Sequence, residues 1–212
     1  MAETRLRKPK VAIACQGGGS QTAFTAGVLK ALAERGVGNE FDLVSINGTS
    51  GGAVCAALMW FGFWKRERPV WGHLMEFWKE ITAQHWGEHM FNDAVLQTLR
   101  VVNSGMLPAF QLSPSSPIVQ SWLSLATFGL LSRFIDFDEI AASGPRTERR
   151  VLIVGAANVS TGKLAKFVSS KEAIRLEHIL ASCAVPTSFR PSGSTTMPTG
   201  MACFPTTHPS KN

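Results

Sequence analysis

The sequence predicts a single α/β domain. Two stretches each pass from a short apolar run, through a glycine-rich turn, into an apolar helix. In the first, the strand is expected at 11–15 and the helix at 23–32; in the second, the strand is expected at 41–46 and the helix at 53–60. Strands that alternate with helices indicate the α/β class. With 212 residues and 45% hydrophobic content, the chain can bury one sizeable core.

The second turn, Gly48-Thr49-Ser50-Gly51-Gly52, fits the pattern G-x-S-x-G between a strand and a helix. A tight turn of this kind presents the serine Oγ at the top of a sheet, where it can act as a nucleophile. The N-terminus of the following helix favours negative charge near that oxygen. The pattern therefore predicts a nucleophile elbow at Ser50, with an ordinary strand-to-helix turn as the alternative.

The first turn contains three consecutive glycines, Gly17, Gly18 and Gly19. Their position between a strand and a helix leaves several backbone N–H groups free to point at one spot. Such a cluster binds a phosphate or stabilises an oxyanion. Paired with a serine elbow, the three glycines are predicted to form an oxyanion hole.

Two phosphate-binding motifs compete with the oxyanion hole, and spacing argues against both. The dinucleotide motif G-x-G-x-x-G has its third glycine position occupied by Thr22. A Walker loop needs Ser or Thr after Gly-Lys, whereas Gly162-Lys163 is followed by leucine. The sequence therefore predicts no nucleotide cofactor.

Three motifs in order along the chain carry a resemblance to a known family. They are Q-G-G-G at 16–19, G-T-S-G-G at 48–52 and A-S-C-A-V-P-T-S-F-R-P at 181–191, the last after a strand expected at 151–159. In these motifs the chain resembles the patatin-like phospholipases. The resemblance spans about residues 9–191 and is loose over 65–145.

This resemblance implies a three-layer α/β/α patatin-like domain at 11–191, with a mainly parallel central sheet and its last elements missing. A basic segment at 1–10 would precede it. The family members are lipid acyl hydrolases that use a Ser–Asp dyad. The implied roles are a nucleophile for Ser50 and an oxyanion hole for Gly17, Gly18 and Gly19. The implied substrate is a phospholipid or another fatty acyl ester, and neither a cofactor nor a metal is needed.

The chain departs from the family pattern at two places. The family has G-G-G-x-[RK]-G in the glycine loop, whereas this chain has Gln21 and Thr22 at the last two positions. The family's catalytic aspartate lies in a D-G-[GA] motif shortly after the F-x-P segment. Here Glu177 is the last acidic residue, so the dyad aspartate is absent and hydrolysis is expected to be impaired.

The segment 192–212 is predicted to be a disordered polar tail or the product of a frameshift. Of its 21 residues, 13 are Ser, Thr, Pro or Gly. When the reading frame is moved one base upstream, the codons of Met201 and Ala202 must read N-A-T and G-G-C, which permits Asp-Gly. The whole shifted tail can read V-R-V-D-D-D-A-Y-W-D-G-L-F-S-D-N-P-P-I-K-E, which places Asp-Gly after F-R-P at the family's spacing.

Two alternative functions stay open. A non-catalytic remnant would keep the fold and bind a lipid or a partner. A Ser-His-Asp hydrolase would need an acid and then a histidine after the serine. Asp136 or Asp138 can serve formally as the acid, with His178, in a helix expected at 171–183, or His208 as the base.

Charge and hydrophobicity bear on location and partners. The net charge of +6 is concentrated partly in 1–10 and 65–68, where solvated charge is the default and attraction to anionic lipid headgroups the functional alternative. No DNA- or RNA-binding motif is present, so no nucleic acid partner is expected. The apolar run 53–64 is too short to span a bilayer and no export signal is visible, so we expect a cytoplasmic protein that contacts membranes peripherally.

The cysteines and the aromatic middle of the chain complete the predictions. Three of the four cysteines lie in apolar segments without zinc or C-x-x-C spacing, which indicates buried free thiols.

Aromatic residues crowd 60–91 and are expected either to pack between helices or to form an apolar lid or acyl-chain groove above Ser50. His85 and His89 have the i, i+4 spacing of metal ligands, but a surface helix is the simpler interpretation.

Overall fold

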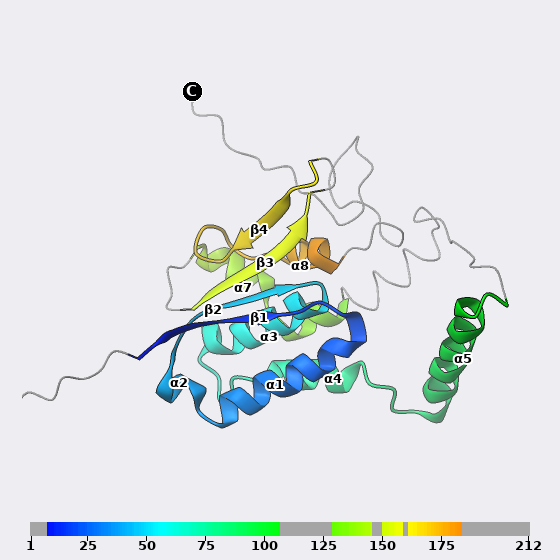
Figure 1. Cartoon of the computed structure of the whole chain (residues 1–212). Coiled ribbons are helices and arrows are strands. Elements are labelled where there is room, and N and C mark those ends of the chain that lie inside the picture. The colour runs from blue at the N-terminus through cyan, green and yellow to red at the C-terminus, as the bar shows by residue number, and fades with distance from the viewer. Residues whose placement is uncertain (1–7, 107–128, 146–149, 159–160, 184–212) are drawn as a thin grey trace, which may run out of the picture.

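The computed structural model describes residues 8–106, 129–145, 150–158 and 161–183. Their strands form a four-stranded sheet in the order β1-β2-β3-β4 (Figure 1). The strands are β1 (Lys10–Cys15), β2 (Asp42–Thr49), β3 (Val151–Ala157) and β4 (Leu164–Val168). β1, β2 and β3 run parallel and β4 is antiparallel to β3. The prediction of a mainly parallel central sheet in an α/β fold is confirmed.

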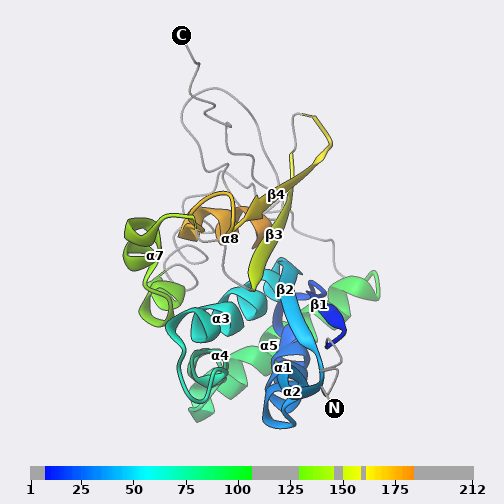
Figure 2. The same cartoon turned by 90° about the vertical axis from the view of Figure 1, so that its left-hand side faces the viewer.

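Helices fill most of the chain between the strands. The elements are the 3₁₀ helix η1 (Gly19–Gln21) and the α-helices α1 (Thr22–Glu34), α2 (Val37–Glu40), α3 (Gly51–Lys65), α4 (Gly72–Glu80), α5 (Trp86–Asn103), α7 (Phe137–Ser143) and α8 (Leu176–Cys183). Helices α3 and α8 lie directly against the sheet, and α1 and α4 pack on α3. Figure 2 shows α3 beneath the strands with α4 and α1 beyond it.

Helix α3 is the centre of the core. Small residues in its first half let it approach the sheet, and large aromatic residues fill the space between helices in its second half. Nearly all of it is buried, and the helix ends at Lys65, followed by Arg66 with a φ of 58°. Because a helix that is apolar all round must be covered on every side, α3 fixes the positions of the elements around it.

One face of the sheet supports this helix. Ile46 pairs with Ile13 on one side and with Leu152 on the other, so the three side chains share a face. Ile46 and Leu152 are fully buried there. The period-two alternation expected of strands therefore places the apolar residues of three strands under α3 and α8.

The expected elements are found, with differences at their ends. The strand expected at 41–46 extends to Thr49, and its helix begins at Gly51, so the turn at Ser50 is tighter than predicted. The helix expected at 171–183 begins only at Leu176, so that prediction was wrong for 171–175. There Lys171 and Glu172 turn back onto Val168, and the Arg175 N–H donates to His178 Nδ1 (3.2 Å), which caps the helix.

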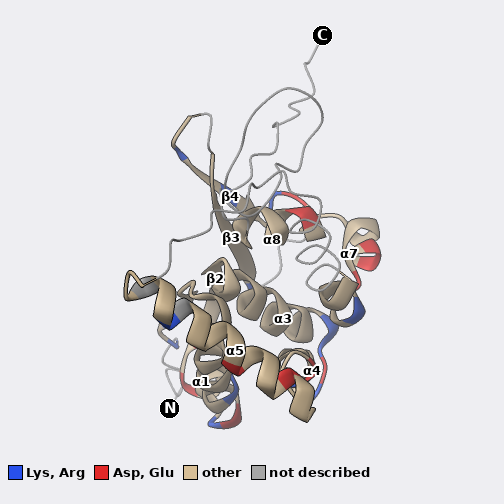
Figure 3. Ribbon diagram, turned by 90° about the vertical axis from the view of Figure 1, so that its right-hand side faces the viewer, with Lys and Arg blue, Asp and Glu red and all other residues tan. Residues whose placement is uncertain are grey.

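The aromatic residues divide into two groups. Trp60, Phe61 and Trp64 in α3 and Phe77 in α4 are buried, as core packing predicts. An apolar lid above Ser50 is therefore wrong for this group, which lies along the second half of α3. Trp86, in α5, is instead 78% exposed. Figures 1 and 3 show α5 as a helix that stands apart from the sheet and carries few charged residues.

The cysteines that the structure describes are free thiols. Cys15 and Cys55 are buried and Cys183 is partly buried, as predicted, while Cys203 lies outside the described residues. Burial raises the pKa of the Cys15 and Cys183 thiols to about 12, and it also raises the pKa of Cys55. These thiols are therefore protonated at neutral pH and are poor nucleophiles.

None of the described helices combines the length and hydrophobicity that crossing a bilayer requires.

Candidate active site

Ser50 forms a strained turn between β2 and α3. Its φ is 55° and its ψ is −133°, a backbone conformation that residues other than glycine seldom adopt. The Ser50 carbonyl accepts hydrogen bonds from the N–H groups of Ala53 (2.8 Å) and Val54 (3.2 Å), which start the helix. Strain of this kind costs about 1–3 kcal/mol and occurs where the surroundings hold the residue in place. It is the conformation expected of a nucleophile elbow.

Two glycines allow the elbow to pack against the strands. A Cβ on Gly48 would lie 2.3 Å from the Gly52 carbonyl oxygen, and a Cβ on Gly52 would lie 2.3 Å from the Cys15 carbonyl oxygen. Both distances are far below any van der Waals contact, so these two positions accept only glycine without a backbone shift. The glycines of the G-x-S-x-G pattern are therefore explained by close backbone approach.

The glycine loop lies directly beside Ser50. A Cβ on Gly17 would lie 3.2 Å from the Ser50 Cβ and 2.9 Å from the Thr49 carbonyl oxygen. The structure thus brings together two motifs that are thirty residues apart in the sequence. The N–H groups of Gly17, Gly18 and Gly19 find no hydrogen-bond acceptor among the described residues. Backbone N–H donors that lack an acceptor and lie next to a serine side chain can stabilise an oxyanion.

Thr22 explains how the loop tolerates its departure from the family pattern. Its backbone is helical (φ −71°, ψ −4°), so this position does not require glycine. The Thr22 hydroxyl donates to the Gly19 carbonyl (2.6 Å) and closes the loop. A Cβ on Gly51 would lie 2.5 Å from the Thr22 Oγ1, so the threonine also packs against the elbow. The departure of this loop from the family's sequence pattern did not by itself reveal the geometry of the loop.

Ser182 in α8 holds the elbow from the other side. The Ser50 N–H donates to the Ser182 Oγ (2.8 Å), and the Ser182 hydroxyl donates to the Gly155 carbonyl (2.6 Å). Ser182 is fully buried. The sequence signal was the A-S-C-A-V-P motif, but the motif gave no role for its serine. The contact spans 132 residues of sequence, so no local pattern could have revealed it.

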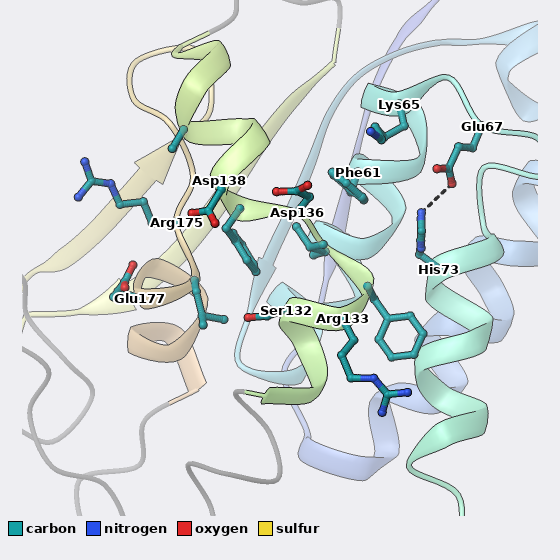
Figure 4. Close-up of a pocket in the computed structure, with 15 residues that line it drawn as sticks. Phe61, Lys65, Glu67, His73, Ser132, Arg133, Asp136, Asp138, Arg175 and Glu177 are labelled. Carbon is teal, nitrogen blue, oxygen red and sulfur yellow. Dashed lines mark ion pairs between the residues drawn. The ribbon is translucent and has the colours of Figure 1, made fainter.

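The candidate acids of a Ser-His-Asp triad lie elsewhere. Asp136 and Asp138 line a cavity of about 700 Å³ together with Lys65 and His73 (Figure 4). Lys65 is the last residue of α3 and bonds to Glu139 in α7, whereas Ser50 precedes the first residue. A helix of 15 residues is about 20 Å long. Both aspartates therefore lie near the C-terminal end of α3, too far from Ser50 to act with it.

His178 is also unsuited to act as a base for Ser50. Its ring stacks on Phe167 (centroids 4.1 Å apart), and its Nδ1 accepts a hydrogen bond from the Arg175 N–H. Burial and the nearby Arg175 charge lower the pKa of His178 to about 4. The imidazole is therefore neutral at physiological pH and serves as a helix cap. The second candidate, His208, lies outside the described residues.

His85 and His89, for which a surface helix was the simpler interpretation, lie at the start of α5. Glu88, in the first turn of α5, accepts hydrogen bonds from the N–H groups of Gln84 (2.7 Å) and His85 (3.1 Å), which lowers its carboxyl pKa. His85 precedes α5 as its N-cap. The described residues contain no group of three or more His, Cys, Asp or Glu side chains placed to hold a metal.

Together, the sheet order, the strained turn at Ser50 and the glycine loop beside it describe an α/β domain with the local backbone geometry of a serine elbow. Comparison with protein families identifies the family. The model of the patatin-like phospholipases matches residues 13–197, so the chain belongs to the patatin-like phospholipase family.

Known proteins and structures add little beyond the family. No curated protein matches the chain. Among solved structures, it is similar to a chain of the heterodimeric ExoU–SpcU complex from the type III secretion system of Pseudomonas aeruginosa. The identity is 18% and the TM-score 0.40, over 84% of this chain and 36% of that chain. The chain thus spans about a third of the length of that protein.

Proposed function

We propose that Ser50 is the nucleophile of a patatin-type serine lipid acyl hydrolase that cleaves fatty acyl esters, as a phospholipase A or esterase does. The observation that carries this proposal is the contact between the two motifs. Ser50 has the strained backbone of an elbow, and the Gly17 backbone lies against it. The family membership supports the lipid substrate.

In the proposed reaction, the Ser50 Oγ attacks an ester carbonyl carbon. The N–H groups of Gly17, Gly18 and Gly19 stabilise the oxyanion that develops on the carbonyl oxygen, and the alcohol leaves. Water then attacks the acyl-enzyme and releases the fatty acid. Losing a single oxyanion donor typically costs about 10²–10³ in rate.

The general base of this reaction is missing from the sequence as it stands. In the family an aspartate accepts the serine proton directly, yet no Asp or Glu follows Glu177 here. The shifted reading of 192–212 would restore Asp-Gly at positions 201 and 202, outside the described residues. We therefore infer that the 212-residue chain hydrolyses esters poorly, and that a chain with the restored tail is active.

The same absence favours a second candidate function. A chain that keeps the fold but lacks the base can still bind a lipid or a partner at a membrane surface. In that case Ser50 would be a structural remnant, held by Ser182 but chemically idle.

Labelling with a serine-reactive fluorophosphonate separates the two functions. In a chain with the restored tail, we expect one equivalent of label on Ser50, identified by mass spectrometry, and no label on Ser50→Ala. Ser20→Ala, in the glycine loop, is the matched control and should label normally. Label at other serines, or no label at all in a folded restored chain, would favour the remnant.

A further inference from the structure

A second cavity lies at the end of α3 that is remote from Ser50. Its volume is about 550 Å³, and it is lined by residues of α1, α2, β1, β2, the second half of α3 and the segment 68–71, and by Arg150. In Figure 1 these elements meet near the label of α2, at the side of the sheet where β2 begins. The volume falls within the range of about 300–1,000 Å³ that small-molecule sites occupy.

The walls of this cavity are mainly apolar. Leu29, Leu43 and Met59 form a buried floor, and Phe63 and Trp71 add aromatic surface. The Trp71 ring is held in place by the Lys30 ammonium, which lies 4.8 Å from its centroid. A floor of this kind favours a hydrocarbon chain, because burying apolar surface is the main driving force for such binding.

Two arginines lie on the lining of the same cavity. Arg68 is exposed, and the Arg150 guanidinium lies 4.4 Å from the centroid of the Phe63 ring. The Arg150 backbone is anchored, because its carbonyl accepts a hydrogen bond from Trp60 Nε1 (3.1 Å). Glu34 is the one acidic residue among the lining residues described, and its carboxylate is 3.7 Å from the Lys30 ammonium. The lining therefore carries two arginines beside an apolar floor, of which Arg68 is exposed.

The cavity in Figure 4 provides a contrast within the same molecule. Its lining carries charges of both signs, with the acids in excess: Lys65, Arg133, Arg175, Glu67, Asp136, Asp138 and Glu177. A carboxylate would therefore find no net positive charge there. Of the two cavities, only the one beside Arg68 combines apolar walls with a surplus of positive charge.

We propose that the cavity lined by Arg68 and Arg150 binds a long-chain fatty acid in its carboxylate form. The carboxylate lies against the exposed guanidinium of Arg68, which matches it in geometry and charge. The hydrocarbon chain extends over Leu29, Leu43 and Met59. The argument stands on the lining of this cavity alone and holds whether or not Ser50 is a nucleophile.

The experiment uses the tryptophan that lines the cavity. The purified 212-residue chain is titrated with 9,10-dibromostearate, kept below its micelle concentration, while tryptophan fluorescence is recorded. Bromine quenches only nearby indole rings, so binding beside Trp71 gives saturable quenching. Replacement of Trp71 by phenylalanine should remove most of it. The corresponding dibrominated alcohol, which has no charge, should bind at least tenfold more weakly.

Matched variants locate the headgroup. Arg68→Gln should weaken dibromostearate binding about tenfold, since a charge-assisted contact at a partly exposed site is lost. Arg66→Gln, with the same change of charge two residues away, should bind like the unaltered chain, and so should Ser50→Ala. Quenching that does not saturate, that survives in Trp71→Phe, or that is equal for acid and alcohol would overturn the proposal. Loss of binding in Ser50→Ala would instead place the fatty acid at the elbow and overturn it as well.

Discussion

The backbone N–H of Ser50 donates a hydrogen bond to the hydroxyl of Ser182, at an N···O distance of 2.8 Å. Through this hydroxyl the elbow is tied to α8 and, by the bond to the Gly155 carbonyl, to β3. The strained conformation of Ser50 is thereby held from a segment more than a hundred residues later. Ser182 therefore positions the backbone of Ser50, the nucleophile proposed above.

Ser182→Ala should therefore destabilise the protein and loosen the elbow. The change removes the acceptor of the Ser50 N–H and the donor to the Gly155 carbonyl, and an unsatisfied buried group costs about 1–3 kcal/mol. We expect the free energy of unfolding in urea to fall by about 2 kcal/mol. Ser104→Ala, which removes a hydroxyl at the end of α5, should change it by less than about 0.5 kcal/mol. Equal effects of the two changes would contradict the role of Ser182.

Gly52→Ala tests the close approach of the elbow to β1. The added methyl group would lie 2.3 Å from the Cys15 carbonyl oxygen, so backbone must move. We expect a loss of about 3 kcal/mol in unfolding free energy, at the upper end for overpacking. Gly87→Ala is the control, because nothing lies within 4 Å of a Cβ there. In α5 that change should be neutral or stabilise slightly. A stable Gly52→Ala protein would show that the packing is looser than described.

His178 predicts a specific pH dependence of stability. Its pKa is about 4 in the folded protein and 6.5 in the unfolded chain. Below pH 6.5 the unfolded chain takes up a proton that the native protein does not, so stability falls as the pH drops from about 6.5 to about 4. The full difference corresponds to roughly 3 kcal/mol.

Urea denaturation at pH 7 and at pH 4.5 measures this dependence. His178→Phe, which keeps a ring beside Phe167, should lose much less stability over this interval than the unaltered chain does. His89→Gln, a change at an exposed position in α5, should retain the original dependence. If His178→Phe shows the same fall in stability, another group is responsible.

The buried thiols of the native protein are predicted to react slowly with thiol reagents. Because burial raises the pKa of Cys15 and Cys183 to about 12 and also raises that of Cys55, the thiolate form is scarce at pH 8. In a Cys203→Ser chain, we expect Ellman's reagent to titrate three thiols rapidly in urea and almost none in the native protein. Rapid reaction of the native Cys203→Ser chain would contradict the burial of these residues.

The sequence was informative wherever structure is decided locally. The two glycine turns, the strands before them and the helices after them follow from short patterns, and each lies close to its predicted position. The start of α8 was not predicted correctly, because it depends on the hydrogen bond between Arg175 and His178 and on a turn against Val168. The role of Ser182 and the tolerance of Thr22 are tertiary contacts, and no single-sequence pattern encodes them.

The frameshift hypothesis is tested at the level of the gene. The nucleotide sequence across codons 188 to 203 should contain a one-base insertion or deletion, and the other frame should read Asp-Gly at positions 201 and 202. An intact frame in the gene for this chain, without a one-base insertion or deletion, would remove the hypothesis and leave the tail as a polar extension.

The central claim is that Ser50 is a correctly placed nucleophile that lacks its base. Hydrolysis of phospholipid vesicles, measured as released fatty acid, tests it directly in two chains: the 212-residue chain, and one whose last 21 residues carry the shifted reading. We predict little or no hydrolysis by the first and clear hydrolysis by the second, lost again on Ser50→Ala. Ser50-dependent hydrolysis by the chain as it stands, or none by the folded restored chain, would contradict the claim.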